Sequence, residues 1–405
     1  MGRFLPCPLP CNSDKHQDCD HQSQTNLQSD SSSNSSLTSQ LSLPSVPSLE
    51  HATTSSAAAA HCIATLKGHS SYIFSLALAG KHLYSGSSDG EIRAWDRHNT
   101  STTVSQGHSA VKSIVVIGDK LITGHSDHRI RVWKIDNAAA NNIHRIKLIS
   151  TLPTVNDRCM RLFSAKNYVQ VRRHKKRTWV HHVDAVAALA TSADGALLYS
   201  VSWDRSMKIW RSSDFKCVES VQNAHDDAIN AVVAGVDGHI YTGSADKVIK
   251  VWKKRDGEKR HSLVSTLEKH RSAVNALALS TDGNVLYSGA CDRSIIVWEK
   301  SGGGGSMAVA GALRGHKKAI LCLAMVADLL CSGSGDTSVR VWRRGSGNSY
   351  SCLAVFQGHK SPVKCLVATF DPNKINDVHN LGNSYQLYSG GLDFDIKVWK
   401  IWVPF

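Results

Sequence analysis

Apolar and polar residues alternate in short stretches along most of the chain, as in Ile73–Leu78 and Ile249–Trp252. A period of two with β-branched and aromatic residues predicts half-buried β-strands. Segments rich in serine, aspartate and glycine, such as Ser87–Gly90 and Ser280–Gly283, separate the stretches and predict tight turns. No apolar run approaches the length of about 18 residues that a membrane-spanning helix needs, so we expect no membrane segment.

The predicted strands recur as seven copies of one unit. Each unit has an aspartate six residues before a tryptophan, a hydroxyl residue four positions before that aspartate, and a histidine further upstream. In the order histidine, hydroxyl, aspartate and tryptophan, the sets are His69, Ser85, Asp89, Trp95; His108, Thr123, Asp127, Trp133; His182, Ser200, Asp204, Trp210; His225, Thr242, Asp246, Trp252; His270, Ser288, Asp292, Trp298; His316, Ser332, Asp336, Trp342; and His359, Ser389, Asp393, Trp399.

The four residue types of each set are suited to one hydrogen-bonded chain. A buried histidine must satisfy both ring nitrogens, which a carboxylate and a hydroxyl can do, and the hydroxyl can also accept the indole N–H. A hydrogen bond to a charged group contributes about 1.5–3 kcal/mol, and leaving its partner unpaired costs more. We therefore expect each set to tie neighbouring strands together.

With these four positions filled in all seven units, the chain resembles the WD-repeat family over about residues 61–400. The resemblance implies an all-β, seven-bladed WD-repeat β-propeller with four-stranded antiparallel blades over residues 61–405. It also implies that the strand at Cys62–Leu66 completes the blade that ends at Trp399 and closes the ring. Residues 1–60, rich in serine, asparagine and glutamine, are expected to form a disordered tail.

The positive charge is concentrated in one part of the chain. The net charge is +14, yet the tail carries two basic and five acidic residues and is negative. Eleven basic and two acidic residues fall in an insertion at 134–180, between the second and third units. Its densest part is the basic patch Arg172, Arg173, Lys175, Lys176 and Arg177.

Three interpretations of the basic patch stay open. It can be a nuclear-import signal or nucleic-acid site, a contact for an acidic protein, or charge that protects an exposed outer strand. Nearby aromatic residues are limited to Tyr168 and Trp179, which disfavours direct nucleic-acid binding.

The sequence offers no recognisable catalytic motif, and no cofactor or metal is expected. The Asp–His–Ser sets resemble a hydrolase triad, but seven equivalent copies with a tryptophan partner favour a structural role. The eleven cysteines are expected to be reduced thiols. We therefore predict a protein without enzymatic activity.

The resemblance places a partner-binding surface on the face that carries the histidine and aspartate turns. Its positions fall where each first strand begins and just before each aspartate. Aromatic residues there are typical interface hot spots. The candidates are Tyr72, Phe74, Lys112, Trp203, Asn230, Asn275, Leu321, Lys364 and Leu392.

The predicted function is a protein-interaction scaffold, monomeric within its complexes and located in the cytoplasm, the nucleus or both. Leu152-Pro153, Asn167–Lys176, His182–Val186 and Gly391–Trp399 resemble plant WD-repeat proteins of the JINGUBANG type. That resemblance implies a plant regulator that binds partners such as transcription factors and restrains pollen germination. The alternative is a substrate receptor of a cullin-RING ubiquitin ligase, for which Trp95-Asp96-Arg97-His98 is an imperfect match because His98 replaces the expected arginine.

Overall fold

The computed structural model describes Ser48 and residues 60–96, 101–136, 145–162, 168–172, 175–301, 306–345, 349–371 and 382–404. For residues 160–162, 168–172 and 175–177 only the backbone is described. The predicted tail therefore lies almost wholly outside the described residues. Ser48, which belongs to it, forms an isolated parallel β-bridge with Ala312.

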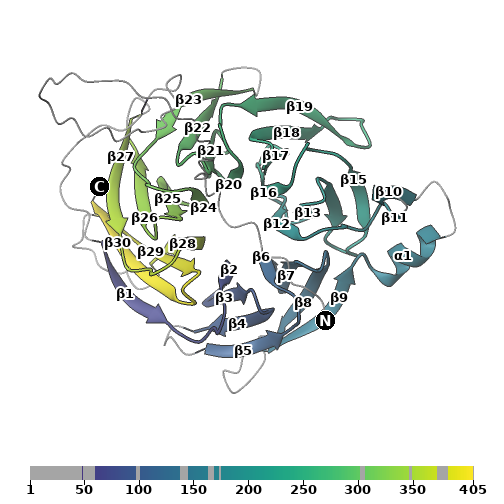
Figure 1. Ribbon diagram of the computed structural model, residues 1–405, viewed down its shortest axis with the longest axis horizontal. Helices are drawn as coiled ribbons and strands as arrows, with labels where there is room; N and C mark the ends of the chain where they lie inside the picture. The colour runs from purple at the N-terminus through teal and green to yellow at the C-terminus, as the bar shows by residue number, and fades with distance from the viewer. Residues whose placement is uncertain are drawn as a thin grey trace, which may run out of the picture.

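Seven four-stranded antiparallel sheets are arranged as blades around a central axis (Figure 1). The expected seven-bladed β-propeller is confirmed. From the inner to the outer strand the blades are β2 (Ile73–Ala79), β3 (His82–Ser87), β4 (Glu91–Trp95), β5 (Ser101–Gln106); β6 (Val111–Ile117), β7 (Lys120–His125), β8 (Ile130–Asp136), β9 (Arg145–Leu152); β12 (Val186–Thr191), β13 (Leu197–Ser202), β14 (Met207–Arg211), β15 (Cys217–Val221); β16 (Ile229–Ala234), β17 (His239–Ser244), β18 (Val248–Lys254), β19 (His261–Glu268); β20 (Val274–Leu279), β21 (Val285–Ala290), β22 (Ile295–Lys300), β23 (Met307–Leu313); β24 (Ile320–Val326), β25 (Leu329–Ser334), β26 (Val339–Arg344), β27 (Tyr350–Phe356); and β28 (Val363–Phe370), β29 (Gly382–Gly391), β30 (Ile396–Pro404), β1 (Ala60–Leu66).

The last blade takes its outer strand from the beginning of the described chain. β1 pairs antiparallel with β30, with Cys62 opposite Trp399 and Leu66 opposite Ile396. Leu66 is buried in a cluster that also contains Ile73 and Trp95 of the first blade. The predicted ring closure is confirmed, and β1 joins the last blade to the first by backbone pairing and by packing.

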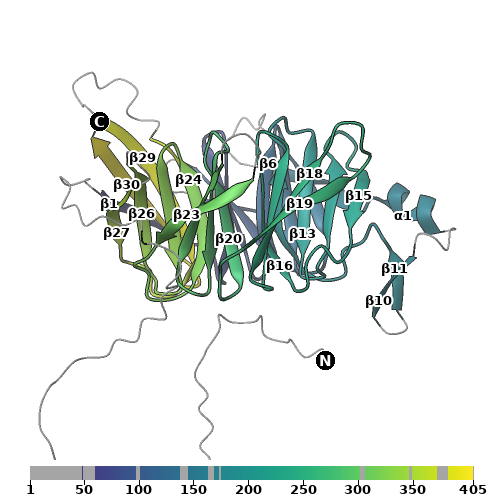
Figure 2. The ribbon, with the colours of Figure 1, turned by 90° about the horizontal axis from the view of Figure 1, so that it is seen from above.

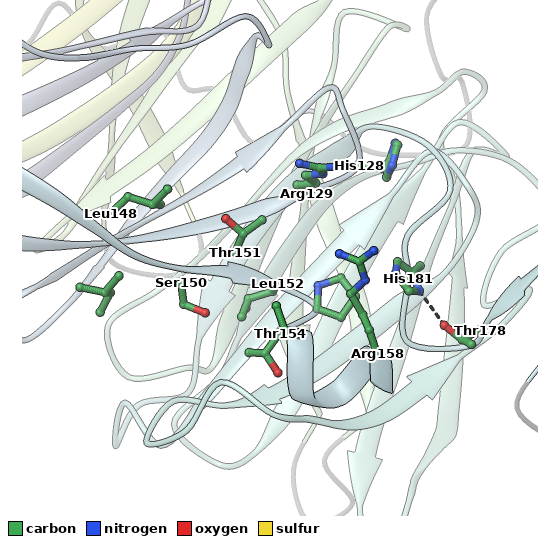
Figure 3. Close-up of a pocket in the computed structure, with 13 residues that line it drawn as sticks. His128, Arg129, Leu148, Ser150, Thr151, Leu152, Thr154, Arg158, Thr178 and His181 are labelled. Atoms are coloured by element: carbon green, nitrogen blue, oxygen red, sulfur yellow. Dashed lines mark hydrogen bonds between the residues drawn. The ribbon is translucent and has the colours of Figure 1, made fainter. Parts of the chain in front are cut away.

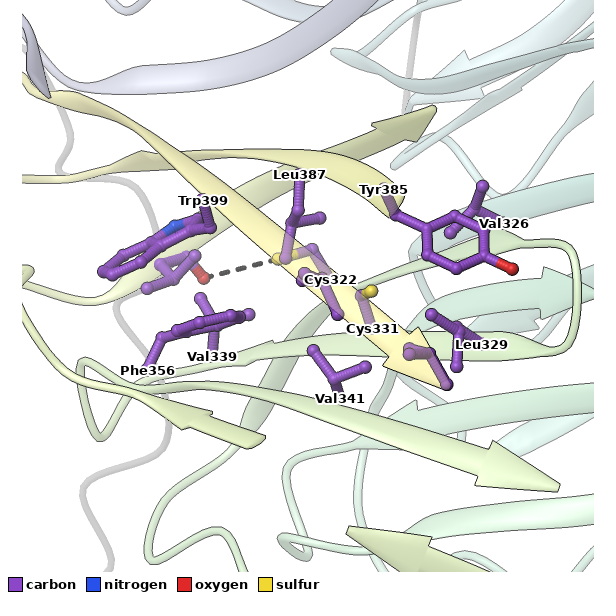
Figure 4. Close-up of a cluster of buried hydrophobic side chains, with 13 residues drawn as sticks. Cys322, Val326, Leu329, Cys331, Val339, Val341, Phe356, Tyr385, Leu387 and Trp399 are labelled. Carbon is purple, nitrogen blue, oxygen red and sulfur yellow. Dashed lines mark hydrogen bonds between the residues drawn. The ribbon is translucent and has the colours of Figure 1, made fainter. Parts of the chain in front are cut away.

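The hydrophobic core lies between adjacent blades. Figure 4 shows one such cluster, in which the Trp399 ring of the last blade stacks on Phe356 of the preceding blade at a centroid distance of 4.6 Å. Glycine lets the blades approach closely. A Cβ atom on Gly86 would lie 2.5 Å from Cγ1 of Val111 on the next blade.

The basic insertion leaves the ring at the second blade. After β9 the chain forms the helix α1 (Val155–Leu162) and a separate two-stranded sheet of β10 (Tyr168–Arg172) and β11 (Lys175–Thr178), which projects from the rim in Figure 2. The outer strand of the second blade is β9, which pairs with β8 from Arg145 to Leu152. The basic segment is therefore not part of that outer strand but lies on the separate two-stranded sheet, and the three interpretations of its charge stay open. No helix among the described residues is long and apolar enough to cross a membrane.

Candidate protein-binding face

Five blades assemble the predicted hydrogen-bonded set. In the fifth blade His270 Nδ1 lies 2.9 Å from Asp292 Oδ2, His270 Nε2 lies 2.7 Å from Ser288 Oγ, and the Trp298 indole donates to Ser288 Oγ at 2.8 Å. The equivalent residues of the third, fourth, sixth and seventh blades make the same contacts.

These contacts determine the charge state of the aspartates. Burial alone would raise the pKa of Asp292, but the hydrogen bond from His270 and that histidine's charge outweigh it, so the pKa lies below its usual value. The carboxylate also accepts the backbone N–H of Arg271 at 3.0 Å. The groups of the set in this blade are thus hydrogen-bonded to one another and to the backbone of the following turn.

The first blade uses a different carboxylate. His69 Nδ1 lies 3.0 Å from Glu91 Oε2, while Asp89 accepts hydrogen bonds from Ser70 and Ser87 in the turn. The longer side chain of Glu91, which is buried, reaches the histidine from β4. The prediction that Asp89 is the histidine's partner is therefore wrong, although Asp89 still organises its turn.

The second blade uses a different histidine. His108 is exposed, whereas His125 is 3 % exposed and its Nε2 lies 2.7 Å from Thr123 Oγ1. Thr123 and His125 are two residues apart on β7 and share a face, so the imidazole of His125 occupies the place expected for His108. The prediction of His108 is wrong.

Because His125 takes the place expected for His108, the electrostatics of the second blade differ from those of the other blades. Asp127 forms an ion pair with Arg131, with 2.5 Å between the carboxylate and guanidinium, instead of binding a histidine. Burial, followed by the charge of Arg131, lowers the pKa of His125 to about 4. The second blade therefore keeps the hydroxyl–indole bond, at 2.9 Å between Trp133 and Thr123, but holds a neutral histidine without a carboxylate.

The predicted binding positions of the first three blades lie in one row. Lys112 Nζ is 4.2 Å from the centroid of the Phe74 ring and 5.1 Å from that of Trp203. Tyr72 is 46 % exposed, and its ring lies 6.4 Å from Phe74. On its other side Tyr72 approaches Phe394 of the last blade at 5.5 Å. A row of aromatic side chains with an ammonium group among them thus spans four consecutive blades, and we call it the aromatic row. Tyr72 and Phe394 are its exposed members, whereas Phe74, Lys112 and Trp203 are half-buried.

The remaining predicted positions are used differently. The Asn230 amide donates to Val274 O at 3.0 Å, and the Asn275 amide donates to Ile320 O at 2.9 Å, so both link adjacent inner strands. Leu321 lies on β24 and is only 8 % exposed, so its prediction as a surface residue is wrong. Lys364, on β28, and Leu392, in the turn after β29, are half-buried residues of the last blade itself.

Phe394 is a surface residue that the sequence analysis missed. It is 41 % exposed and has a φ of 69°, a left-handed conformation that is uncommon for a bulky residue. Every blade places the residue after its aspartate in this conformation, and Phe394 is the aromatic one among them. An aromatic residue at that turn position was the available signal.

The other predicted sites lie partly outside the described residues. Arg172 is the last residue of β10, and Lys175, Lys176 and Arg177 lie on β11, whereas Arg173 is outside the described residues. Arg97 and His98 of the ligase-receptor motif are also outside them. Among the residues whose side chains are described, no group of three or more His, Cys, Asp or Glu is placed to hold a metal ion.

Comparisons with known proteins agree with this architecture. The family model "WD domain, G-beta repeat" matches residues 60–96, 173–211, 215–253, 261–299, 308–343 and 350–400. The matched segments correspond to six blades, and the second blade, with its altered network, is not among them.

Three curated relatives share parts of this chain. Protein Notchless of Drosophila melanogaster is 38 % identical over 21 % of this chain and 16 % of its own length. The small ribosomal subunit protein RACK1 of the same species is 28 % identical over 24 % of this chain and 30 % of its own length. Autophagy-related protein 16 of Arabidopsis thaliana is 23 % identical over 47 % of this chain and 36 % of its own length. The chain thus spans well under half of each relative.

Proposed function

Because the chain belongs to the WD40 repeat family, we propose that it is a non-enzymatic scaffold that binds partner proteins through the aromatic row. The observation that carries the proposal is the continuity of this row across four blades, from Phe394 through Tyr72, Phe74 and Lys112 to Trp203. Aromatic side chains supply large contact areas at low entropic cost and dominate many interfaces.

The row also suggests what a partner presents. Tyr72 and Phe394 are both more than 40 % exposed and offer an apolar contact. Lys112 places a positive charge 4.2 Å from the Phe74 ring centroid, and a cation–π contact of this kind contributes about 0.5–1 kcal/mol at an exposed site. A partner segment with an apolar side chain next to a carboxylate would match both features.

The structural commitment of the histidines supports a scaffold over an enzyme. In the blades that assemble the predicted set, each histidine has its two nitrogens bound to the aspartate and the hydroxyl of its own blade, as in His270 with Asp292 and Ser288. In a hydrolase triad the serine hydroxyl must be within reach of a substrate, whereas Ser288 is fully buried and also accepts the Trp298 indole N–H at 2.8 Å. The arrangement therefore favours binding over catalysis.

The test compares Trp203→Ala with Leu263→Ala. Leu263 is 45 % exposed on the outer strand β19 of the fourth blade and is not part of the aromatic row, so it is a matched control for loss of exposed apolar surface. We expect Trp203→Ala to leave the melting temperature unchanged and to weaken partner binding about tenfold or more. Captured proteins are identified and quantified by mass spectrometry. Equal capture by the unmodified protein, Trp203→Ala and Leu263→Ala would contradict the proposal that the aromatic row binds partners.

The narrower resemblance to JINGUBANG-type plant proteins extends the proposal. The partners would then be regulatory proteins such as transcription factors, met in the cytoplasm or nucleus by a monomeric propeller, with a role in pollen germination. The same list of captured proteins tests this extension. Abundant cullin-adaptor peptides, depleted by the Trp203→Ala change, would favour the ligase substrate receptor instead.

A further inference from the structure

A groove of about 730 Å³ opens at the rim of the propeller, between the second and third blades. It is lined by β9 and the segment that leads into α1, by the turn at His128 and Arg129, and by Thr178 and His181 before the third blade. In Figure 3 Leu148 lies at one end of the groove, and Arg158, Thr178 and His181 lie at the other. The aromatic row does not include any of these residues.

One part of the groove is apolar and exposed. Leu148 is 46 %, Ile149 45 % and Val155 73 % exposed. Leu148 and Ile149 are neighbours on β9, where a β-bulge opposite Val132 and Trp133 leaves both side chains accessible. Exposed apolar residues that lie together in this way are typical of surfaces that another molecule covers.

The charged part of the groove is entirely basic. Arg129 and Arg158 are exposed, and neither guanidinium forms an ion pair with a carboxylate among the described residues. None of the thirteen lining residues is acidic. The nearby Asp157 does not line the groove; it is 4 % exposed and accepts the backbone N–H of Cys217 at 3.0 Å.

The backbone of β9 offers a third element of recognition. β9 is the outer strand of its blade and pairs with β8 alone among the described strands. An outer strand presents backbone N–H and C=O groups that an extended peptide can pair with. Arg145 and Lys147 are exposed on the same strand and add to the positive charge.

We propose that this rim groove binds an extended acidic peptide segment of a partner protein, which adds to β9 as a further strand. The peptide's carboxylates would bind Arg129 and Arg158, since arginine recognises carboxylates with two parallel hydrogen bonds. Its apolar side chains would cover Leu148 and Ile149. The site is separate from the aromatic row and would give the scaffold a second point of attachment.

The probe is a fluorescent peptide of about ten residues, long enough to pair with a strand, in which glutamate alternates with valine. Its binding to the full chain is followed by fluorescence anisotropy. We expect binding that weakens with added salt, and that falls about tenfold or more in the double variant Arg129→Ala, Arg158→Ala. A peptide with glutamine in place of glutamate is expected to bind at least about tenfold more weakly.

The matched control is the double variant Lys254→Ala, Arg255→Ala, which removes the same charge from exposed positions at and after the end of β18. This control variant and Trp203→Ala should both bind the peptide as strongly as the unmodified protein does. The rim groove and the aromatic row are thus tested independently of each other. Melting temperatures confirm that every variant is folded. Equal binding of the glutamine peptide, or equal loss in the control variant, would overturn the proposal. Binding of a single-stranded oligonucleotide through Arg129 and Arg158, without binding of the glutamate peptide, would overturn it as well.

Discussion

Two histidine-to-alanine substitutions in the second blade test which histidine belongs to the hydrogen-bonded network. The repeat pattern assigns His108 to it, whereas the structure places His125 there. His125→Ala removes a side chain that is 3 % exposed and lies 2.7 Å from Thr123 Oγ1 and 3.2 Å from Ser109 O. His108→Ala removes an exposed side chain at the position that the repeat pattern assigns to the network.

The expected cost of His125→Ala follows from these contacts. Thr123 keeps the Trp133 indole as a partner at 2.9 Å, so the hydroxyl is not orphaned, and the two lost hydrogen bonds, to Thr123 and to Ser109 O, together contribute about 1 kcal/mol. The cavity left by a buried ring of this size adds about 2 kcal/mol. The sum is about 3 kcal/mol, whereas a change at an exposed position such as His108 stays within about 0.5 kcal/mol.

The assay is thermal unfolding of both variants at neutral pH. With an unfolding entropy of about 2.1 cal/mol/K per residue over a propeller of roughly 340 residues, 3 kcal/mol lowers Tm by about 4 °C. His125→Ala should show this shift, and His108→Ala should melt within about 1 °C of the unmodified protein. A larger effect at His108 than at His125 would refute the assignment of His125 to the network.

Three further predictions concern packing, closure and pH. Gly86→Ala should destabilise the protein by about 1–3 kcal/mol in urea unfolding, because its Cβ would lie 2.5 Å from Val111 Cγ1; an unchanged midpoint would contradict the tight blade contact. Deleting residues 61–67 should unfold or aggregate the protein, since it removes the strand that pairs with β30; a soluble product with an unchanged Tm would contradict ring closure. Because burial lowers the pKa of His125 from 6.5 to about 4, the folded state binds fewer protons than the unfolded state between those values. Stability should therefore fall as the pH drops from 7 to 4, and the Tm gap between the unmodified protein and His125→Ala should narrow; a constant gap would argue against a buried neutral imidazole.

The repeat pattern predicted the framework well, because strand alternation and the spacing of aspartate and tryptophan depend on local geometry. Aspartate lies in a turn and tryptophan on the next strand of the same hairpin, so their separation is set within one blade. The histidine lies further away in sequence, and here the prediction failed for His108. Nothing in the sequence excludes His125, two residues beyond Thr123 on the same strand, from filling the same space.

The sequence also predicted only part of the candidate binding surface. Position within the repeat predicted a shared surface for Tyr72, Lys112 and Trp203, which the structure links through Phe74, but it could not distinguish an exposed residue from a covered one. Leu321 has the same repeat position as its counterparts and is buried. Contacts between blades decide exposure, and these join residues that are distant in sequence.

The sequence by itself determined the seven-bladed fold, the closing strand and the composition of the hydrogen-bonded set in five of the blades, because these follow from periodicity and from the bonding needs of buried polar groups. Only the tertiary structure decided which side chains fill the network in the first two blades, which residues form the aromatic row, and that β9, Arg129 and Arg158 meet at one groove. The physical reason is that packing between blades brings together side chains that are distant in sequence, and no repeating sequence pattern signals such contacts.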